Sequence, residues 1–111
     1  MNATLTNLLN DLKSATASFT AVISQIEKEF THHPTAFKNG DVYNEANENQ
    51  GSAKVLAYAK LNNLSEADTL HLFAEHYQAV LTDPNGTAHQ NIRQFMQHGW
   101  AGVSFEGTVL S

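Results

Sequence analysis

The side chains best suited to chemistry in this 111-residue sequence lie in two short polar segments. The first runs from Asn44 to Lys54 and the second from His89 to Arg93. Amides, a hydroxyl, an imidazole and cationic groups can together orient an anionic or hydroxylated ligand. If the two segments face one another, they form one polar pocket. The candidate ligand- or partner-binding residues are Asn44, Asn49, Ser52, Lys54, His89, Asn91 and Arg93.

Each segment also has an alternative, purely structural interpretation. Gly51-Ser52-Ala53-Lys54 is predicted to open a helix, where free backbone N–H groups attract anions. It is not a P-loop, because the G-x-x-x-x-G-K-S/T pattern is missing. Simple N-capping by Ser52 is the alternative there. In the second segment, Arg93 can instead hold loop carbonyls and carboxylates in a structural network.

Six histidines raise the hypothesis of a metal site, since imidazole binds metals near neutral pH. No two of them stand four residues apart, and the H-E-x-x-H pattern is absent. The acid and amide residues from Asp41 to Asn49 do not fit the EF-hand template and are typical of a solvated loop. The absence of cysteine excludes thiolate ligands, disulfides and cysteine catalysis. We expect no metal and no cofactor, and local spacing identifies no catalytic residue.

The charge balance limits the classes of partner. Six Lys and Arg residues against eleven Asp and Glu residues give a net charge of -5. Nucleic acids and anionic membranes both need a positive surface, so neither is an expected partner. No apolar run approaches the roughly 18 residues of a membrane span, and no signal peptide pattern opens the sequence. These features predict a cytoplasmic protein.

The first half of the chain predicts two helices and a hairpin. Apolar residues recur with helical spacing from Leu5 to Leu12 and again from Phe19 to Phe30, with Thr4 and Ser18 as expected N-caps. Residues 35–44 are predicted to form a β-hairpin, because Asn39-Gly40 suits a two-residue type I′ turn. Its buried face is expected to hold Phe37 and either Val42 or Tyr43.

The second half predicts three more helices. One follows Gly51-Ser52, and one runs from the cap Ser65 to about residue 82 with the strongest apolar stripe in the chain. The last opens with a capping box at Thr87 and Gln90 and ends at Gly99. Residues 103–106 alternate like a strand that can join the hairpin. The prediction is one α+β domain over residues 1–111, with about five short helices and a small antiparallel sheet.

Three stretches of the sequence, residues 33–40, 44–54 and 89–100, resemble the HopJ type III effector family over nearly the whole chain. The resemblance implies a single small bacterial domain whose molecular activity is undefined. The chain departs from the family pattern at Ala53, where a cysteine is common, and at Asn47, where a glycine is common; the first departure argues against a thiol mechanism. The matching signature residues are Pro34, Thr35, Phe37, Asn39, Gly40, Asn44, Asn49, Gly51, Ser52, Lys54, His89, Asn91, Ile92, Arg93, Gly99 and Trp100.

Two functions from different classes follow. The leading one is a small binding domain that acts through a protein partner, which the effector resemblance favours. The alternative is a small-ligand-binding protein or enzyme, with His89 as acid–base and Arg93 and Lys54 holding an anion. The resemblance also offers secretion by a type III system as an alternative to a cytoplasmic location. Residues 1–20, of which nine are Ser, Thr or Asn, would then be the export signal.

Overall fold

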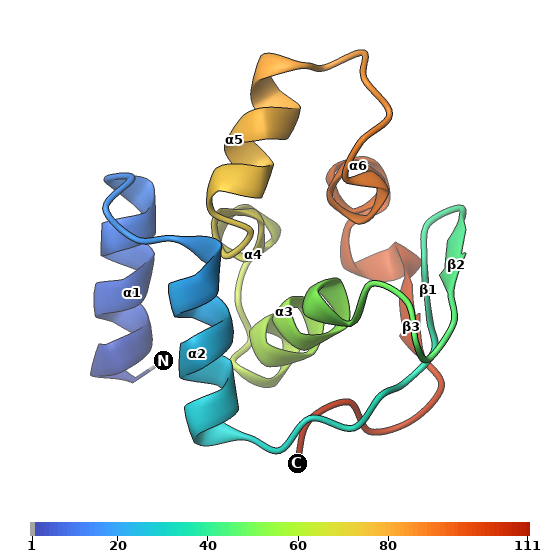
Figure 1. The fold of residues 1–111 in the computed structure, drawn as a ribbon, viewed down its shortest axis with the longest axis horizontal. Coiled ribbons are helices and arrows are strands. Elements are labelled where there is room, and N and C mark those ends of the chain that lie inside the picture. Colours follow the sequence, from blue (N-terminus) through green and yellow to red (C-terminus); the bar gives the residue numbers. More distant parts are fainter. Residues whose placement is uncertain (1) are drawn as a thin grey trace.

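The computed structural model describes residues 2–111 and has the predicted α+β architecture (Figure 1). Helix α3 occupies the middle of the molecule and packs against α2, with the three-stranded sheet on its other side. In chain order the elements are α1 (Ala3–Lys13), α2 (Phe19–Glu29), β1 (Phe37–Asn39), β2 (Val42–Asn44), α3 (Gln50–Leu61), α4 (Glu66–His71), α5 (Glu75–Thr82), α6 (Gln90–His98), the 3₁₀ helix η1 (Gly99–Gly102) and β3 (Val103–Phe105).

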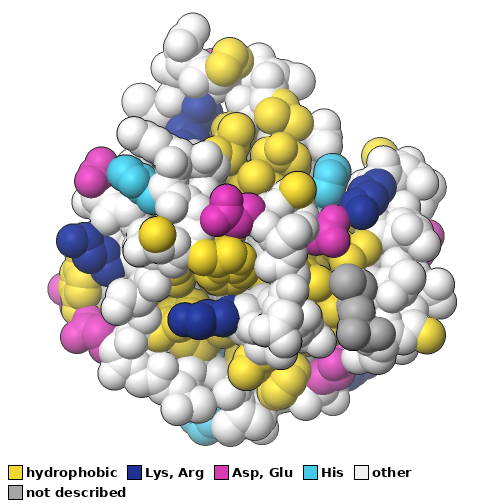
Figure 2. All heavy atoms as spheres, turned by 180° about the vertical axis from the view of Figure 1, so that it is seen from behind, with side chains coloured by type: hydrophobic (Ala, Val, Ile, Leu, Met, Phe, Trp, Pro, Cys, Tyr) yellow, Lys and Arg dark blue, Asp and Glu magenta, His cyan; other side chains and the backbone are white. Residues whose placement is uncertain are grey.

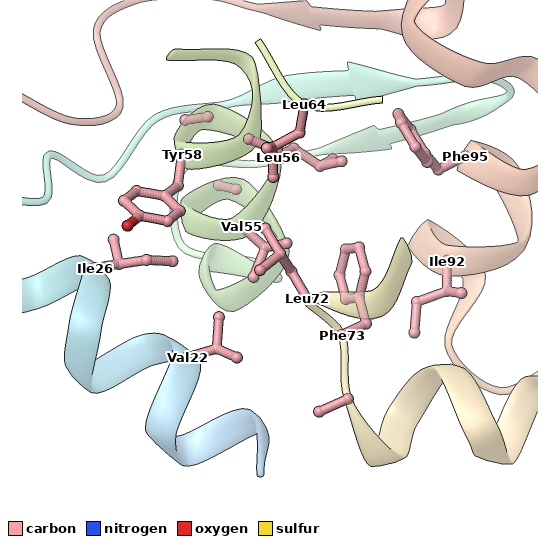
Figure 3. Close-up of a cluster of buried hydrophobic side chains, with 14 of the residues drawn as sticks. Val22, Ile26, Val55, Leu56, Tyr58, Leu64, Leu72, Phe73, Ile92 and Phe95 are labelled. Carbon is pink, nitrogen blue, oxygen red and sulfur yellow. The ribbon is translucent and has the colours of Figure 1, made fainter. Parts of the chain in front are cut away.

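The core is built around α3, which is apolar on almost every side and is therefore buried among the other elements. Figure 3 shows side chains from α2, α3 and α6 converging on one cluster. Tyr58 is fully buried, and its hydroxyl donates a 2.6 Å hydrogen bond to Glu29 Oε2. The buried residues of α3 are Ala53, Val55, Leu56, Ala57, Tyr58 and Ala59. None of the helices in residues 2–111 is long and apolar enough to cross a membrane.

The sheet has the strand order β2-β1-β3 and is antiparallel throughout. The third strand therefore joins the hairpin, as residues 103–106 suggest. The predicted turn is wrong by one residue: Asn39 pairs with Val42, so the loop is Gly40 and Asp41. Of these two loop residues, Gly40 has a positive φ (+59°) and Asp41 does not, which fits a type II′ turn instead of type I′. Asn39 remains in the strand, where its side chain is fully buried.

The single helix predicted after Ser65 is also wrong, because the chain breaks it between α4 and α5. Ser65 does cap α4, accepting a hydrogen bond from the N–H of Asp68. The break is at Ala74, whose φ of +53° is outside the helical region. The apolar residues before and after Ala74 all keep helical spacing, so the sequence pattern alone cannot reveal that the chain changes direction there. The break buries Leu72 and Phe73 together.

Two helices begin in a way that the capping predictions miss. α3 begins at Gln50 after Asn49, and α6 begins at Gln90 after His89; both preceding residues are left-handed, with φ of +49° and +58°. Neither makes a side-chain cap hydrogen bond. The N-cap prediction for Ser52 and the capping box at Thr87 are therefore wrong.

The remaining helix ends mix correct and wrong predictions. Ser18 does cap α2, and its side chain accepts from the N–H of Ala21. Gly99 ends α6 with φ +62°. Helix α1 is capped by Asn2, not by the predicted Thr4.

Candidate functional site

A cleft of about 350 Å³ opens where the first turns of α3 and α6 meet the junction between α4 and α5. That volume is at the lower end of the range for small-molecule sites, about 300–1,000 Å³. One part of the lining is polar and another is apolar. The lining residues are Phe19, Val42, Asn49, Gly51, Ser52, Phe73, His76, His89, Gln90, Asn91 and Ile92.

The first turns of α3 and α6 bring free backbone donors to this cleft. Within residues 2–111, the N–H groups of Gly51 and Ser52 have no hydrogen-bond partner, and the same holds for Gln90 and Asn91. The first N–H groups of a helix carry partial positive charge from the helix dipole. Because neither helix has a side-chain cap, all four donors remain available to an acceptor in the cleft.

Two imidazoles stand beside these donors. The rings of His76 and His89 have centroids 4.9 Å apart at an interplanar angle of 35°, and the ring of Phe19 meets His76 edge-on at 4.8 Å. Neither histidine side chain has a hydrogen bond or ion pair with the part of the chain that the structure describes. Each imidazole ring can therefore offer an N–H donor to an acceptor in the cleft.

Behind the cleft, the buried side chains of Asn39, Asn44 and Asn91 form an amide network that the exposed Asn49 joins. Asn91 Nδ2 donates to Asn44 Oδ1 at 3.0 Å, and Asn44 Nδ2 donates back to Asn91 Oδ1 at 3.1 Å. Asn39 Nδ2 donates to the backbone oxygen of Asn91 at 2.8 Å, and Asn49 Nδ2 donates to Asn44 Oδ1 at 2.8 Å. The network links β1, β2, the loop before α3, and α6. One of its atoms, Asn39 Oδ1, is buried without a partner.

Comparison with known proteins places the chain in a family. The model of the HopJ type III effector protein family matches residues 5–110. The chain belongs to the HopJ family. A crystal structure of VPA0580, a protein of unknown function, is similar to this HopJ chain with a TM-score of 0.88 and 38% sequence identity; the alignment covers 100% of this chain and 93% of VPA0580. No curated protein matches it.

The structure brings together four of the seven site residues expected in this HopJ domain. Asn49, Ser52, His89 and Asn91 all line the cleft. Asn44 does not line it; its side chain lies in the buried network, where it is 1% exposed. The polar part of the cleft is therefore made from the two predicted segments together with His76 of α5.

The two expected cations are engaged elsewhere. Lys54 Nζ pairs with Glu27 Oε2 of α2 at 3.2 Å. Arg93 Nε donates to the backbone oxygen of Ala88 at 2.6 Å, and its Nη1 donates to that of Pro84 at 3.3 Å. Arg93 thus supports the loop before α6, as its structural alternative predicts. Neither side chain lines the cleft.

Sequence reasoning missed His76, Phe19 and Phe73. In the continuous helix predicted after Ser65, His76 is an ordinary surface residue. In the helix predicted from Phe19 to Phe30, Phe19 belongs to the apolar stripe that faces the core. No local pattern signals the break at Ala74, which redirects the chain so that His76 faces His89. Across residues 2–111 no three His, Cys, Asp or Glu side chains are grouped as metal ligands.

One carboxylate lies next to the aromatic part of the cleft. Glu75 Oε1 accepts a 2.7 Å hydrogen bond from the backbone N–H of Phe19. Hydrogen bonds from its own backbone N–H and from that of Phe19 hold the pKa of Glu75 below its ordinary value. Glu75 is therefore ionised at neutral pH, and it ties the start of α2 to the start of α5.

Proposed function

We propose that this HopJ domain binds a small organic anion in the cleft between α3 and α6. The observation that carries the proposal is the convergence of four partnerless backbone N–H groups and two imidazoles on one cavity. Helix N-termini attract anions because their N–H groups and dipoles favour negative charge. The Ser52 hydroxyl adds a further donor at the same place.

The other part of the lining supports an organic anion in preference to a bare ion. Phe19, Val42, Phe73 and Ile92 present carbon to the cleft. A ligand with an acid group toward the helix ends and an apolar group toward these side chains would match both parts of the lining.

The arrangement supports binding more directly than catalysis. The Ser52 hydroxyl makes no hydrogen bond to either imidazole within residues 2–111, so no activated nucleophile of the Ser–His type is formed. His89 is an exposed residue at the rim, where it can donate to an anion without a partner of its own. We therefore assign His76 and His89 the role of ligand donors.

The test is an amide NMR titration of ¹⁵N-labelled protein with inorganic phosphate, sugar phosphates, nucleotides and short carboxylates. We expect saturable shifts at residues 49–52 and 89–92, with no shifts at residues 31–35. His89→Asn should weaken binding about tenfold, because it removes a ring hydrogen-bond donor from the rim of the cleft. His33→Asn is the matched control, since His33 bonds Ser111 and does not line the cleft. Signals at 49–52 and 89–92 that stay fixed with every compound would refute the proposal.

A protein partner is the second candidate, favoured by a specific surface feature and by the effector description of the family. Leu81 of α5 and Met96 of α6 are 46% and 44% exposed and line one apolar groove of about 410 Å³. Hydrophobic side chains gather toward the α5 end of the face in Figure 2. We propose that an apolar segment of a partner docks there. Leu81→Asp should then abolish a partner's binding without changing shifts in the cleft.

Type III secretion is proposed on the family description alone. Of the expected export signal at residues 1–20, Met1 lies outside the described residues, and α1 buries Leu5, Leu9 and Leu12 in the core. Export would therefore require α1 to unfold from the domain. A culture-medium assay of the full chain in strains with and without a type III apparatus tests this; equal amounts outside both strains would refute it.

A further inference from the structure

The ring of Phe19 lies beside the junction between α4 and α5, the first turn of α5 and the start of α3. It is stacked with Phe73 at a centroid distance of 6.4 Å and an interplanar angle of 10°, and it meets His76 edge-on. On the α3 side, its Cζ lies 3.5 Å from the point where a Cβ on Gly51 would stand. The ring is nonetheless only half-buried, so part of its surface faces the cleft.

The backbone of Phe19 is held as well as its ring. Phe19 is the first residue of α2, and its N–H donates to Glu75 Oε1 at 2.7 Å across a sequence separation of 56 residues. Glu75 is the first residue of α5, which starts directly after the positive-φ residue Ala74. The break between α4 and α5 therefore places Glu75 at the backbone of Phe19 and His76 at its ring.

Phe19 also differs from the other apolar residues of the lining. Phe73 and Ile92 are each 2% exposed and form the floor of the cleft, so they offer little surface to a ligand. Val42 is half-buried but small. Phe19 is the large apolar side chain in the lining that keeps exposed surface, and an aromatic face gains most from a planar partner.

We propose that Phe19 is the specificity-determining residue of the cleft, and that Glu75 is its positioning residue. The ring selects anions that carry a planar group, such as aryl phosphates or aryl carboxylates, over bare inorganic anions. This inference rests on the proposed function, since it assumes that the acid group is held by the starts of α3 and α6.

The test compares phenyl phosphate with inorganic phosphate, both titrated by amide NMR into the full chain. The phosphate group is common to the two probes, so the ratio of their affinities isolates the ring. We expect the wild type to bind phenyl phosphate about tenfold or more tightly, from burial of the ring against Phe19. Phe19→Ala should bring the affinities for phenyl phosphate and inorganic phosphate within about threefold of one another.

Further variants separate selectivity from folding. Glu75→Gln should keep the ratio, because its amide oxygen still accepts from the N–H of Phe19, whereas Glu75→Ala should lower it. Phe19→Leu should give an intermediate ratio of the two affinities. It replaces Phe19→Ala in the test if that variant does not fold. Phe30→Ala is the matched control, since Phe30 packs on Tyr58 at the other end of α2.

The outcomes also distinguish this inference from the proposed function. Equal binding of both probes by the wild type, or an unchanged ratio in Phe19→Ala, would overturn the role of Phe19 while the anion site stands. Absence of binding by either probe, with no shifts at residues 49–52 and 89–92, would overturn the anion site itself.

Discussion

The buried amide network and the cleft beside it are both polar, but they differ in how many of their donors already have partners. In the network, Asn44 and Asn91 exchange two hydrogen bonds, and Asn39 and Asn49 add donors to the same pair. In the cleft, four backbone N–H groups and two imidazoles have no partner in residues 2–111. Polar groups that satisfy one another stabilise the fold, whereas donors left free at a cavity are suited to a ligand.

Asn91 belongs to both regions and so shows how they are coupled. Its side chain is buried in the network, while its free backbone N–H is in the first turn of α6, at the cleft. The network therefore fixes the first turn of α6 relative to the hairpin and the loop before α3. Asparagines that the sequence offers as ligand-binding residues thus also form hydrogen bonds that join α6 to the hairpin and to the loop before α3.

The largest expected effect comes from breaking the network. Asn91→Ala should lower the free energy of unfolding by about 2–4 kcal/mol, because it removes both hydrogen bonds that the buried Asn44 side chain exchanges with the Asn91 side chain and one that Asn39 donates to it. Urea denaturation measures the change. Asn47→Ala, in an exposed loop, is the control and should change stability by less than about 0.5 kcal/mol. A loss at Asn91 no larger than that of the control would show that the network is not a scaffold.

The buried hydroxyl of Tyr58 also has a hydrogen-bond partner. Its removal should lower the free energy of unfolding by a smaller amount, and that amount should depend on pH. Burial, followed by the hydrogen bond to Glu29, raises the pKa of Tyr58 above its ordinary value of about 10. The stability this gives is fully present below pH about 10 and is lost as pH rises through the higher folded pKa. Tyr58→Phe should cost about 1–2 kcal/mol at pH about 8.

The pH comparison is the check on Tyr58. The stability difference between wild type and Tyr58→Phe should shrink as urea denaturation is repeated at increasing pH above about 10. Tyr43, whose hydrogen bond with Glu106 raises its pKa to about 12, is present in both proteins and cancels. A difference that stays constant across this range would mean that the fold does not raise the pKa of Tyr58.

A substitution at the cleft should raise the stability of the protein, whereas the two substitutions above lower it. His89 is left-handed with φ +58°, a conformation that costs a non-glycine residue about 1–2 kcal/mol. After the entropy cost of glycine, His89→Gly should stabilise the protein by about 0.5–1 kcal/mol and still weaken anion binding. His33→Gly, away from the cleft, is the control and should not be stabilising. Thermal unfolding of both variants decides; destabilisation by His89→Gly would mean that His89 is structural.

The smallest effect is expected at Lys54. Its pair with Glu27 is partly exposed and is worth about 0.2–1 kcal/mol. Lys54→Gln should therefore change stability by less than about 1 kcal/mol and leave the affinity for phenyl phosphate unchanged, as measured by the same titration. A tenfold weaker affinity would return Lys54 to the site that the sequence predicts for it.

Local signals in the sequence predicted most of the elements correctly. The apolar spacing of α1 and α2, the caps Ser18 and Ser65, and the alternation at residues 103–106 each depend on neighbouring residues only. Local residue types also marked the segments of Asn49 and His89 as candidate binding segments. Local residue types could not show that the two segments face one another.

What the sequence could not predict depends on contacts between distant residues. The stripe around Ala74 is equally compatible with one helix or two, and packing of Leu72 and Phe73 decides for two. Asn39 suits a turn by its own propensity, but the network with Asn91 holds it in β1. Phe19 and His76 join the cleft only because α4 and α5 are separate helices.

The central claim, that network donors are satisfied and cleft donors are free, is tested most directly by amide hydrogen exchange. Without ligand, the backbone amides of Gly51, Ser52, Gln90 and Asn91 should exchange rapidly, while those in the middle of α3 are protected. Saturating phenyl phosphate should protect these four amides selectively. Protection of all four before any ligand is added, or no added protection at saturation, would contradict the account.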